Sequence, residues 1–160
     1  MASTASVPGH GALKIALVSG RSAVVERRAA SPLRLLCPKN AGSAAWTYAS
    51  TFGGGLVDGD DVYLRVAVER GASALLATQA STKAYPASAG ARQTVEAIVG
   101  ADADLVVLSD PLVPFAGARV ESLLDVRLAE GATLVAVEAL AAGRVASGER
   151  WAAARCQTRL

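Results

Sequence analysis

The chain has 160 residues, of which 52% are hydrophobic and 19% charged, enough for one domain with a sizeable core. Its net charge is +2, from 16 basic and 14 acidic residues without a contiguous block, and aromatic residues make up only 4%. This composition argues against a nucleic-acid-binding protein, because such surfaces cluster lysine and arginine and stack bases on aromatic rings.

The N-terminal residues have neither the basic leader nor the uninterrupted apolar run of a signal peptide. No apolar stretch approaches the ~20 residues that cross a bilayer. Cys37 and Cys156 lie far apart in no metal-binding spacing, and His10 is the only histidine. His10 sits between two glycines near the N-terminal end, which argues against a histidine-based triad, and a single histidine cannot form a multi-histidine metal site. We therefore expect a reduced, cytoplasmic protein with no membrane segment.

The first predicted strand covers residues 13–17, where apolar and polar positions alternate. Further on, residues 51–61 read TFGGGLVDGDD, three successive glycines followed by three aspartates. A phosphate-binding loop would close on Gly-Lys-Ser/Thr and open a helix, and a calcium loop would end on a bidentate glutamate. Neither pattern is present, so we expect a glycine-rich bend followed by an Asp-Gly turn.

Residues 61–70 form the next predicted strand, with Val62, Leu64, Val66 and Val68 on one face. The polar segment 78–90 then places Ser81 and Lys83 on the same face of an extended chain. A lysine beside a serine can activate it as a nucleophile, which makes a serine–lysine hydrolase one alternative function. An exposed polar edge or loop is the other interpretation of the same pair.

Residues 92–99 and 119–128 also alternate and are predicted strands. In the second of them, the residues predicted to face inward are Val120, Leu124, Val126 and Leu128. Between them, residues 110–119 contain two prolines that end one strand and fix an extended apolar crossing. Residues 132–142 are alanine-rich, which favours helix, but their two valines and their position after a glycine turn favour a strand.

A weak internal repeat joins these strands. Three alternating segments end at Gly-Ala pairs that begin at Gly71, Gly100 and Gly131, so the pairs recur at nearly equal intervals. Glycine at these points suits turns that need a positive φ. The repeat predicts one all-β domain over residues 1–160, with few or no helices and solenoid-like stacked sheets. An antiparallel sandwich is the alternative.

The last motif, GRVASGERW at residues 143–151, brackets a turn with Arg144 and Glu149. We expect an ion pair between them across the turn. None of the motifs assembles a convincing active site, and this argues against an enzyme.

Taken in order, five motifs resemble the urease accessory protein D family. They are SPLRLLCP (31–38), GGGLVDGD (53–60), TQASTKAY (78–85), DPLVPFAGAR (110–119) and GRVASGERW (143–151). The family-motif residues are Gly53, Gly54, Gly55, Gly59, Asp60, Thr78, Gln79, Thr82, Lys83, Tyr85, Pro111, Phe115, Gly143, Arg144, Gly148 and Glu149. Family chains continue beyond the position of Leu160, so the resemblance implies that this is the N-terminal part of a longer protein.

The resemblance implies a β-rich, helically wound fold and a scaffold without enzymatic activity. Such a scaffold binds apo-urease and, through accessory protein F, recruits the GTPase G that carries nickel. It also implies an internal passage for nickel in transit, with no tightly bound cofactor. Asp60 is the residue we expect to contact nickel, because weak oxygen ligands would let the ion move on. A generic β-solenoid interaction module without a metal role is the alternative.

Overall fold

The computed structural model describes residues 7–39 and 42–160, which form thirteen strands and one short 3-10 helix, η1 (Val145–Ser147). Sheet A has the spatial order β13-β11-β8-β5-β1-β2, sheet B the order β12-β9-β6-β4-β3, and sheet C pairs β10 with β7. The strands of sheet A are β1 (His10–Val18), β2 (Arg21–Ala29), β5 (Asp61–Val68), β8 (Ala91–Val99), β11 (Arg119–Leu128) and β13 (Arg155–Arg159). Sheet B contains β3 (Leu33–Leu36), β4 (Ala45–Thr51), β6 (Ser73–Thr78), β9 (Asp104–Leu108) and β12 (Thr133–Val137), and sheet C contains β7 (Thr82–Ala84) and β10 (Leu112–Pro114).

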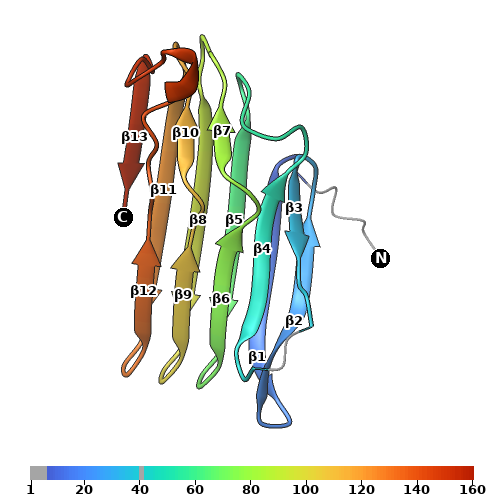
Figure 1. The fold of residues 1–160 in the computed structure, drawn as a ribbon. Coiled ribbons are helices and arrows are strands. Elements are labelled where there is room, and N and C mark those ends of the chain that lie inside the picture. Colours follow the sequence, from blue (N-terminus) through green and yellow to red (C-terminus); the bar gives the residue numbers. More distant parts are fainter. Residues whose placement is uncertain (1–6, 40–41) are drawn as a thin grey trace.

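The chain winds in coils between two stacked layers (Figure 1). Each complete coil passes along sheet A, turns into sheet B, bends into sheet C and returns to sheet A. Successive coils pair in parallel, as β5, β8 and β11 do in sheet A and β6, β9 and β12 in sheet B. Antiparallel pairing between strands is confined to β1 with β2 and β3 with β4 in the described residues. The predicted helically wound all-β fold is confirmed, and the sandwich alternative is wrong, because the later pairings join equivalent strands of successive coils instead of the two arms of a hairpin.

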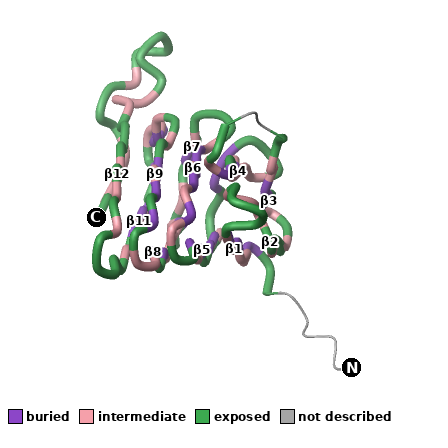
Figure 2. The backbone as a smooth tube through the Cα atoms, turned by 90° about the horizontal axis from the view of Figure 1, so that it is seen from below, coloured by how far each residue is buried: buried purple, intermediate pink, exposed green. Residues whose placement is uncertain are grey.

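The core lies between the layers, where buried residues line the inner faces of the strands (Figure 2). The four residues of β5 predicted to face inward are all buried, at most 7% exposed, namely Val62, Leu64, Val66 and Val68. Leu128 was also predicted to face inward but is 49% exposed. Strand β13 pairs only with residues 119–123 of β11, so the second half of β11 has no neighbour beyond it among the described residues.

The turns from sheet A to sheet B stack on one another, and their alignment corrects the predicted repeat. Gly71 and Gly131 have φ values of +68° and +70°, as predicted, but the equivalent residue of the middle turn is Asp102, with φ +56°. The N–H of Gly71 donates to a carbonyl of the next turn (3.0 Å), and the N–H of Asp102 donates to one in the turn after it (3.1 Å). The repeat is therefore marked by Gly71, Asp102 and Gly131, and Gly100 is not a positive-φ position.

Gly100 is required for a different reason, which is close approach of the neighbouring turn. A Cβ atom at this position would lie 2.8 Å from Arg70 N and 3.0 Å from Val68 O. Both are backbone atoms, which cannot move aside as a flexible side chain can. Residue 100 must therefore be glycine, because the backbone of the preceding coil leaves no room for a Cβ atom.

None of the helical structure in residues 7–39 and 42–160 is long and apolar enough to span a membrane.

We predict that Gly100→Ala lowers the free energy of unfolding by about 1–3 kcal/mol, because the added methyl group overpacks two stacked turns. Asp102→Gly is the matched variant in the same turn and should change the free energy of unfolding by less than about 1 kcal/mol. It relieves the positive φ and removes an ion pair with Arg70 that is exposed at both ends. Urea unfolding of the two variants checks this, and equal effects would contradict it.

Candidate functional site

A cavity of about 430 Å³ lies between the sheets where sheet B bends into sheet C. Its walls combine apolar core residues with a group of polar side chains contributed by successive coils. The polar residues include Thr78, Thr82, Gln93, Thr94, Ser109, Ser122 and Glu138. Because an interior normally excludes polar groups unless they are hydrogen-bonded, this concentration of oxygen and amide atoms is the feature that marks the site.

One wall of the cavity comes from sheet A. The register aligns Val62 with Gln93, Gln93 with Ser122, and Ser122 with Thr158. Gln93 Nε2 donates a hydrogen bond to Ser122 Oγ at 2.9 Å, and Ser122 is only 8% exposed. An inward column that is apolar in β5 thus becomes polar in the later coils.

The opposite wall comes from sheet B, at the point where its strands end. Thr78 is the last residue of β6, and Ser109 and Glu138 directly follow β9 and β12. Thr78 Oγ1 accepts a hydrogen bond from Asp110 N–H at 2.7 Å, which fixes its position at the bend. Burial raises the pKa of Glu138 above its ordinary value. The two walls together line the space with hydroxyl and amide groups, the carboxyl group of Glu138 and the side chain of Lys83.

Ser81 and Lys83, the candidate hydrolase pair, also line this cavity. Both residues are exposed, and within the described part of the chain no hydrogen bond joins Ser81 to Lys83. The structure thus places both residues at an exposed polar edge that borders the cavity.

Asp58 is the acidic residue of the glycine-rich motif with the largest number of hydrogen bonds. Its Oδ2 accepts from Ser88 Oγ (2.6 Å) and Ser88 N (3.0 Å), and its Oδ1 accepts from Ala89 N (2.9 Å) and Gly90 N (2.8 Å). These donors, with the Ser88 hydroxyl first, lower the pKa of Asp58 to about 2. Asp58 thus ties the turn before β5 to the turn before β8. Sequence reasoning missed this role, because the receiving turn belongs to the next coil.

Asp60, the predicted nickel contact, is not among the residues that line the cavity. Its Oδ2 accepts a hydrogen bond from Val57 N–H at 2.9 Å, and its own N–H donates to Val57 O at 3.1 Å. It therefore closes the Asp-Gly turn before β5, and it borders a shallow groove with Arg92, Arg119 and Arg155. A nickel contact at Asp60 stays a prediction.

The family-motif residues of three coils meet in an aromatic column at one end of the strands. The rings of Tyr85 and Phe115 pack edge to face with centroids 5.2 Å apart, and Arg144 Cζ lies 4.5 Å from the Phe115 centroid. Arg144 forms an ion pair with Glu149, as predicted, and Ala116 N–H donates to Glu149 Oε2 at 3.1 Å. These contacts lower the pKa of Glu149, with the Arg144 hydrogen bond as the largest cause.

The motif residues therefore divide between two places. Those that line the cavity are Gly54, Thr78, Gln79, Thr82 and Lys83, and those of the aromatic column are Tyr85, Phe115, Arg144 and Glu149. Gly55 packs beneath Tyr85, where a Cβ atom would lie 2.9 Å from its ring. The remaining ones, Gly53, Gly59, Asp60, Pro111, Gly143 and Gly148, belong to the turns and connections between strands.

No group of three or more histidine, cysteine, aspartate or glutamate side chains within residues 7–39 and 42–160 is arranged to hold a metal ion. Cys37 and Cys156 are both free thiols.

Comparison with known proteins gives a consistent match. A family model described as UreD urease accessory protein matches residues 7–160. Urease accessory protein UreD of Sorangium cellulosum is 51% identical over 152 residues, covering 95% of this chain and 49% of the relative. Urease accessory protein UreD of Anaeromyxobacter sp. is 48% identical, covering 90% and 49%, and urease accessory protein D of Oryza sativa subsp. indica is 41% identical, covering 94% and 51%. The chain spans about half the length of these curated relatives.

We predict that the hydrogen bonds of Asp58 make stability depend on pH in acid. The folded-state pKa, about 2, lies below the ordinary value of 3.8, so the stabilisation is present above about pH 4 and is lost as the pH falls towards 2. In Asp58→Asn the amide does not titrate in this range. The urea midpoint of the variant should therefore be lower than that of the wild type near neutral pH and should converge with it in acid. Parallel pH profiles for the two proteins would rule out this role.

Proposed function

The chain belongs to the UreD urease accessory protein family, and from this membership we propose that it acts in urease maturation as a scaffold without enzymatic activity. The observation that carries the proposal is the family match over residues 7–160. In this role the protein binds apo-urease together with accessory proteins F and G and supports the insertion of nickel into the urease active site. The free thiols of Cys37 and Cys156 suit the reducing cytoplasm, where we place this activity.

Nickel is the cargo of this process, and the cavity between the sheets is our candidate for its passage. Polar side chains line both walls, with Gln93 and Ser122 on one and Ser109 and Glu138 on the other. Hydroxyl, amide and carboxyl oxygens bind a divalent nickel ion less tightly than clustered thiolates or imidazoles do. A cavity lined by such oxygen atoms supports a role in passing the nickel ion on and not in storing it.

Two other functions remain to be separated from this one. A generic interaction module would share the fold and the exposed edges but would not co-purify with urease subunits. A serine–lysine hydrolase would react with a serine-directed probe at Ser81, although the exposed Ser81 and Lys83 make no hydrogen bond to each other in the described structure. Co-purification of the full-length protein with urease and accessory protein F therefore tests the proposal as a whole.

We predict that Ser122→Leu lowers the nickel content of urease while the variant still co-purifies with urease and accessory protein F. The leucine side chain fills part of the cavity and replaces the hydroxyl that Gln93 contacts. Asp125→Leu is the matched control, because Asp125 lies on the same strand with its side chain exposed on the outer face. Nickel is measured in urease purified from cells that produce each variant.

Three results are informative. Reduced nickel with normal co-purification, seen only for Ser122→Leu, supports the passage. Full nickel content in a folded Ser122→Leu protein contradicts the passage and leaves the scaffold role standing. Absence of co-purification for the wild-type protein contradicts the scaffold role itself.

For Asp60 we predict that Asp60→Ala reduces the amount of folded protein, whereas Asp60→Asn does not. The carboxylate accepts the Val57 N–H, and an asparagine oxygen can do the same, so only alanine loses about 1 kcal/mol from the turn. Circular dichroism and yield report on folding, and nickel in purified urease reports on transit. Normal folded protein with low nickel in both variants would instead assign Asp60 to the nickel path.

A further inference from the structure

The charges of the chain are distributed very unevenly between its first coil and the rest. Residues 1–57 contain six lysines and arginines and one acid, Glu26, whereas residues 58–160 contain ten basic residues and thirteen acids. The small net charge of the whole chain conceals this asymmetry. A strongly basic segment beside an acidic remainder points to a localised electrostatic role.

Folding places this basic coil at one end of the solenoid. Strand β2 is the last strand of sheet A, and β3 is the last strand of sheet B. The two edge strands lie at the same end of the stack (Figure 1). Ala30 N–H donates to His10 O at 2.9 Å, and Leu33 N–H donates to Ala30 O at 3.0 Å, so the connection between β2 and β3 is fixed.

A groove of about 540 Å³ lies along this connection. Three arginines line it, Arg27, Arg28 and Arg34, together with the ring of Phe52; Leu33 and Leu35 border it but are only 3% and 5% exposed. Phe52 is 55% exposed, and Arg34 Cζ lies 5.4 Å from its ring centroid. The groove therefore combines cationic groups with an exposed aromatic ring.

The arginines of the groove are poorly neutralised. Arg28 pairs with Glu26, but Arg27 and Arg34 form no ion pair within residues 7–39 and 42–160. Within residues 7–39 and 42–160, two guanidinium groups of the groove therefore have no carboxylate partner.

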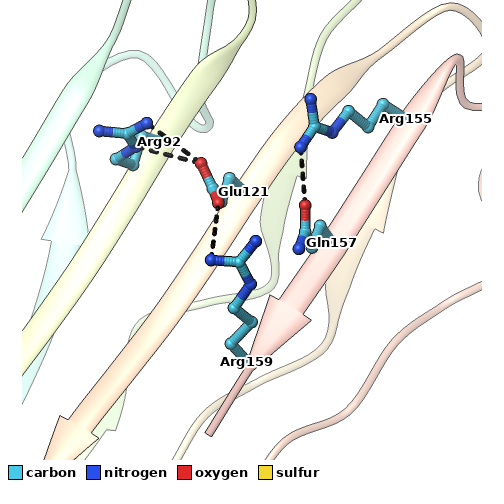
Figure 3. Close-up of polar contacts among 5 residues, drawn as sticks. All are labelled: Arg92, Glu121, Arg155, Gln157 and Arg159. Carbon is cyan, nitrogen blue, oxygen red and sulfur yellow. Dashed lines mark hydrogen bonds and ion pairs between the residues drawn. The ribbon is translucent and has the colours of Figure 1, made fainter.

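The later coils show the opposite arrangement on the outer face of sheet A. Glu121 lies between Arg92 and Arg159, within 3.2 Å and 3.7 Å of their guanidinium nitrogens, and Arg155 donates to Gln157 (Figure 3). For Arg92, Arg155 and Arg159, polar partners come from the same strand or a neighbouring one. The basic groove of the first coil lacks such a neighbour on the outside of the stack in the described residues.

We propose that the basic groove binds an acidic segment of a partner protein, one in which carboxylates alternate with apolar side chains. Carboxylates would pair with Arg27 and Arg34, and apolar side chains would contact the exposed ring of Phe52, so both chemistries of the groove are used. A nucleic acid would use the arginines but leave the apolar surface in water, and one exposed ring is a poor platform for stacked bases. Because binding is measured on this protein alone, it does not depend on the role in urease maturation.

The test uses fluorescence anisotropy with the full-length protein at physiological salt. The probe is a fluorescein-labelled peptide in which glutamate and leucine alternate, and the competitors are its lysine counterpart and a single-stranded DNA of equal charge. The double variant Arg27→Glu/Arg34→Glu should bind the acidic peptide at least about tenfold more weakly than the wild type. The control Arg119→Glu/Arg150→Glu makes the same change in net charge at exposed positions outside the groove and should bind normally.

Equal weakening in both double variants would show attraction to net charge alone and would overturn the proposal. Tighter binding of the DNA than of the acidic peptide would overturn the proposal in favour of a nucleic acid. If the wild type did not bind the acidic peptide at all, the proposal would also be overturned. Should the charge reversal prevent folding, Arg27→Gln/Arg34→Gln removes the charges with less disturbance. A folded glutamine variant that binds the peptide as tightly as the wild type would also overturn it.

Discussion

Each strand of the later coils hydrogen-bonds in parallel to the equivalent strand of the coil before it, so a side chain lies beside its counterpart from the preceding coil. The other features of the molecule follow from this register. It stacks the turns at Gly71, Asp102 and Gly131, and it brings the ring of Tyr85 to that of Phe115. The register also aligns the side chains at equivalent positions of successive coils, so that they form columns that run through several coils.

The register separates two kinds of polar column. Columns on the outer face carry charges and form ion pairs across strands, as Glu121 does with Arg92 and Arg159. Columns on the inner face carry neutral groups that bond to each other, as Gln93 does to Ser122. No buried side-chain nitrogen or oxygen within the described residues is left without a hydrogen-bond partner. The interior can therefore hold a polar cavity without the penalty that isolated polar groups would carry.

Much of the fold could be predicted from local pattern. Alternation identified β5 and its four buried residues, and the ion pair between Arg144 and Glu149 followed from their separation across one turn. The errors concern residues whose environment comes from another coil. Asp58 receives its donors from residues 88–90, Gly100 is constrained by the backbone of residues 68–70, and the cavity walls come from strands in opposite sheets. Such contacts depend on the register between coils, which alternation within a single strand does not determine.

The stack of coils also has a consequence for how the described part of the chain comes apart. In such an array each layer is held by the layers on either side, so the total stability is nearly a sum of nearest-neighbour terms. Within residues 7–39 and 42–160, strand β12 has a neighbour on one side only, and β13 covers only half of β11, so this layer is held by fewer terms than the layers between. Within the described residues, opening of such an edge layer therefore costs less free energy than opening of the layers between, so local stability varies along the axis of the stack.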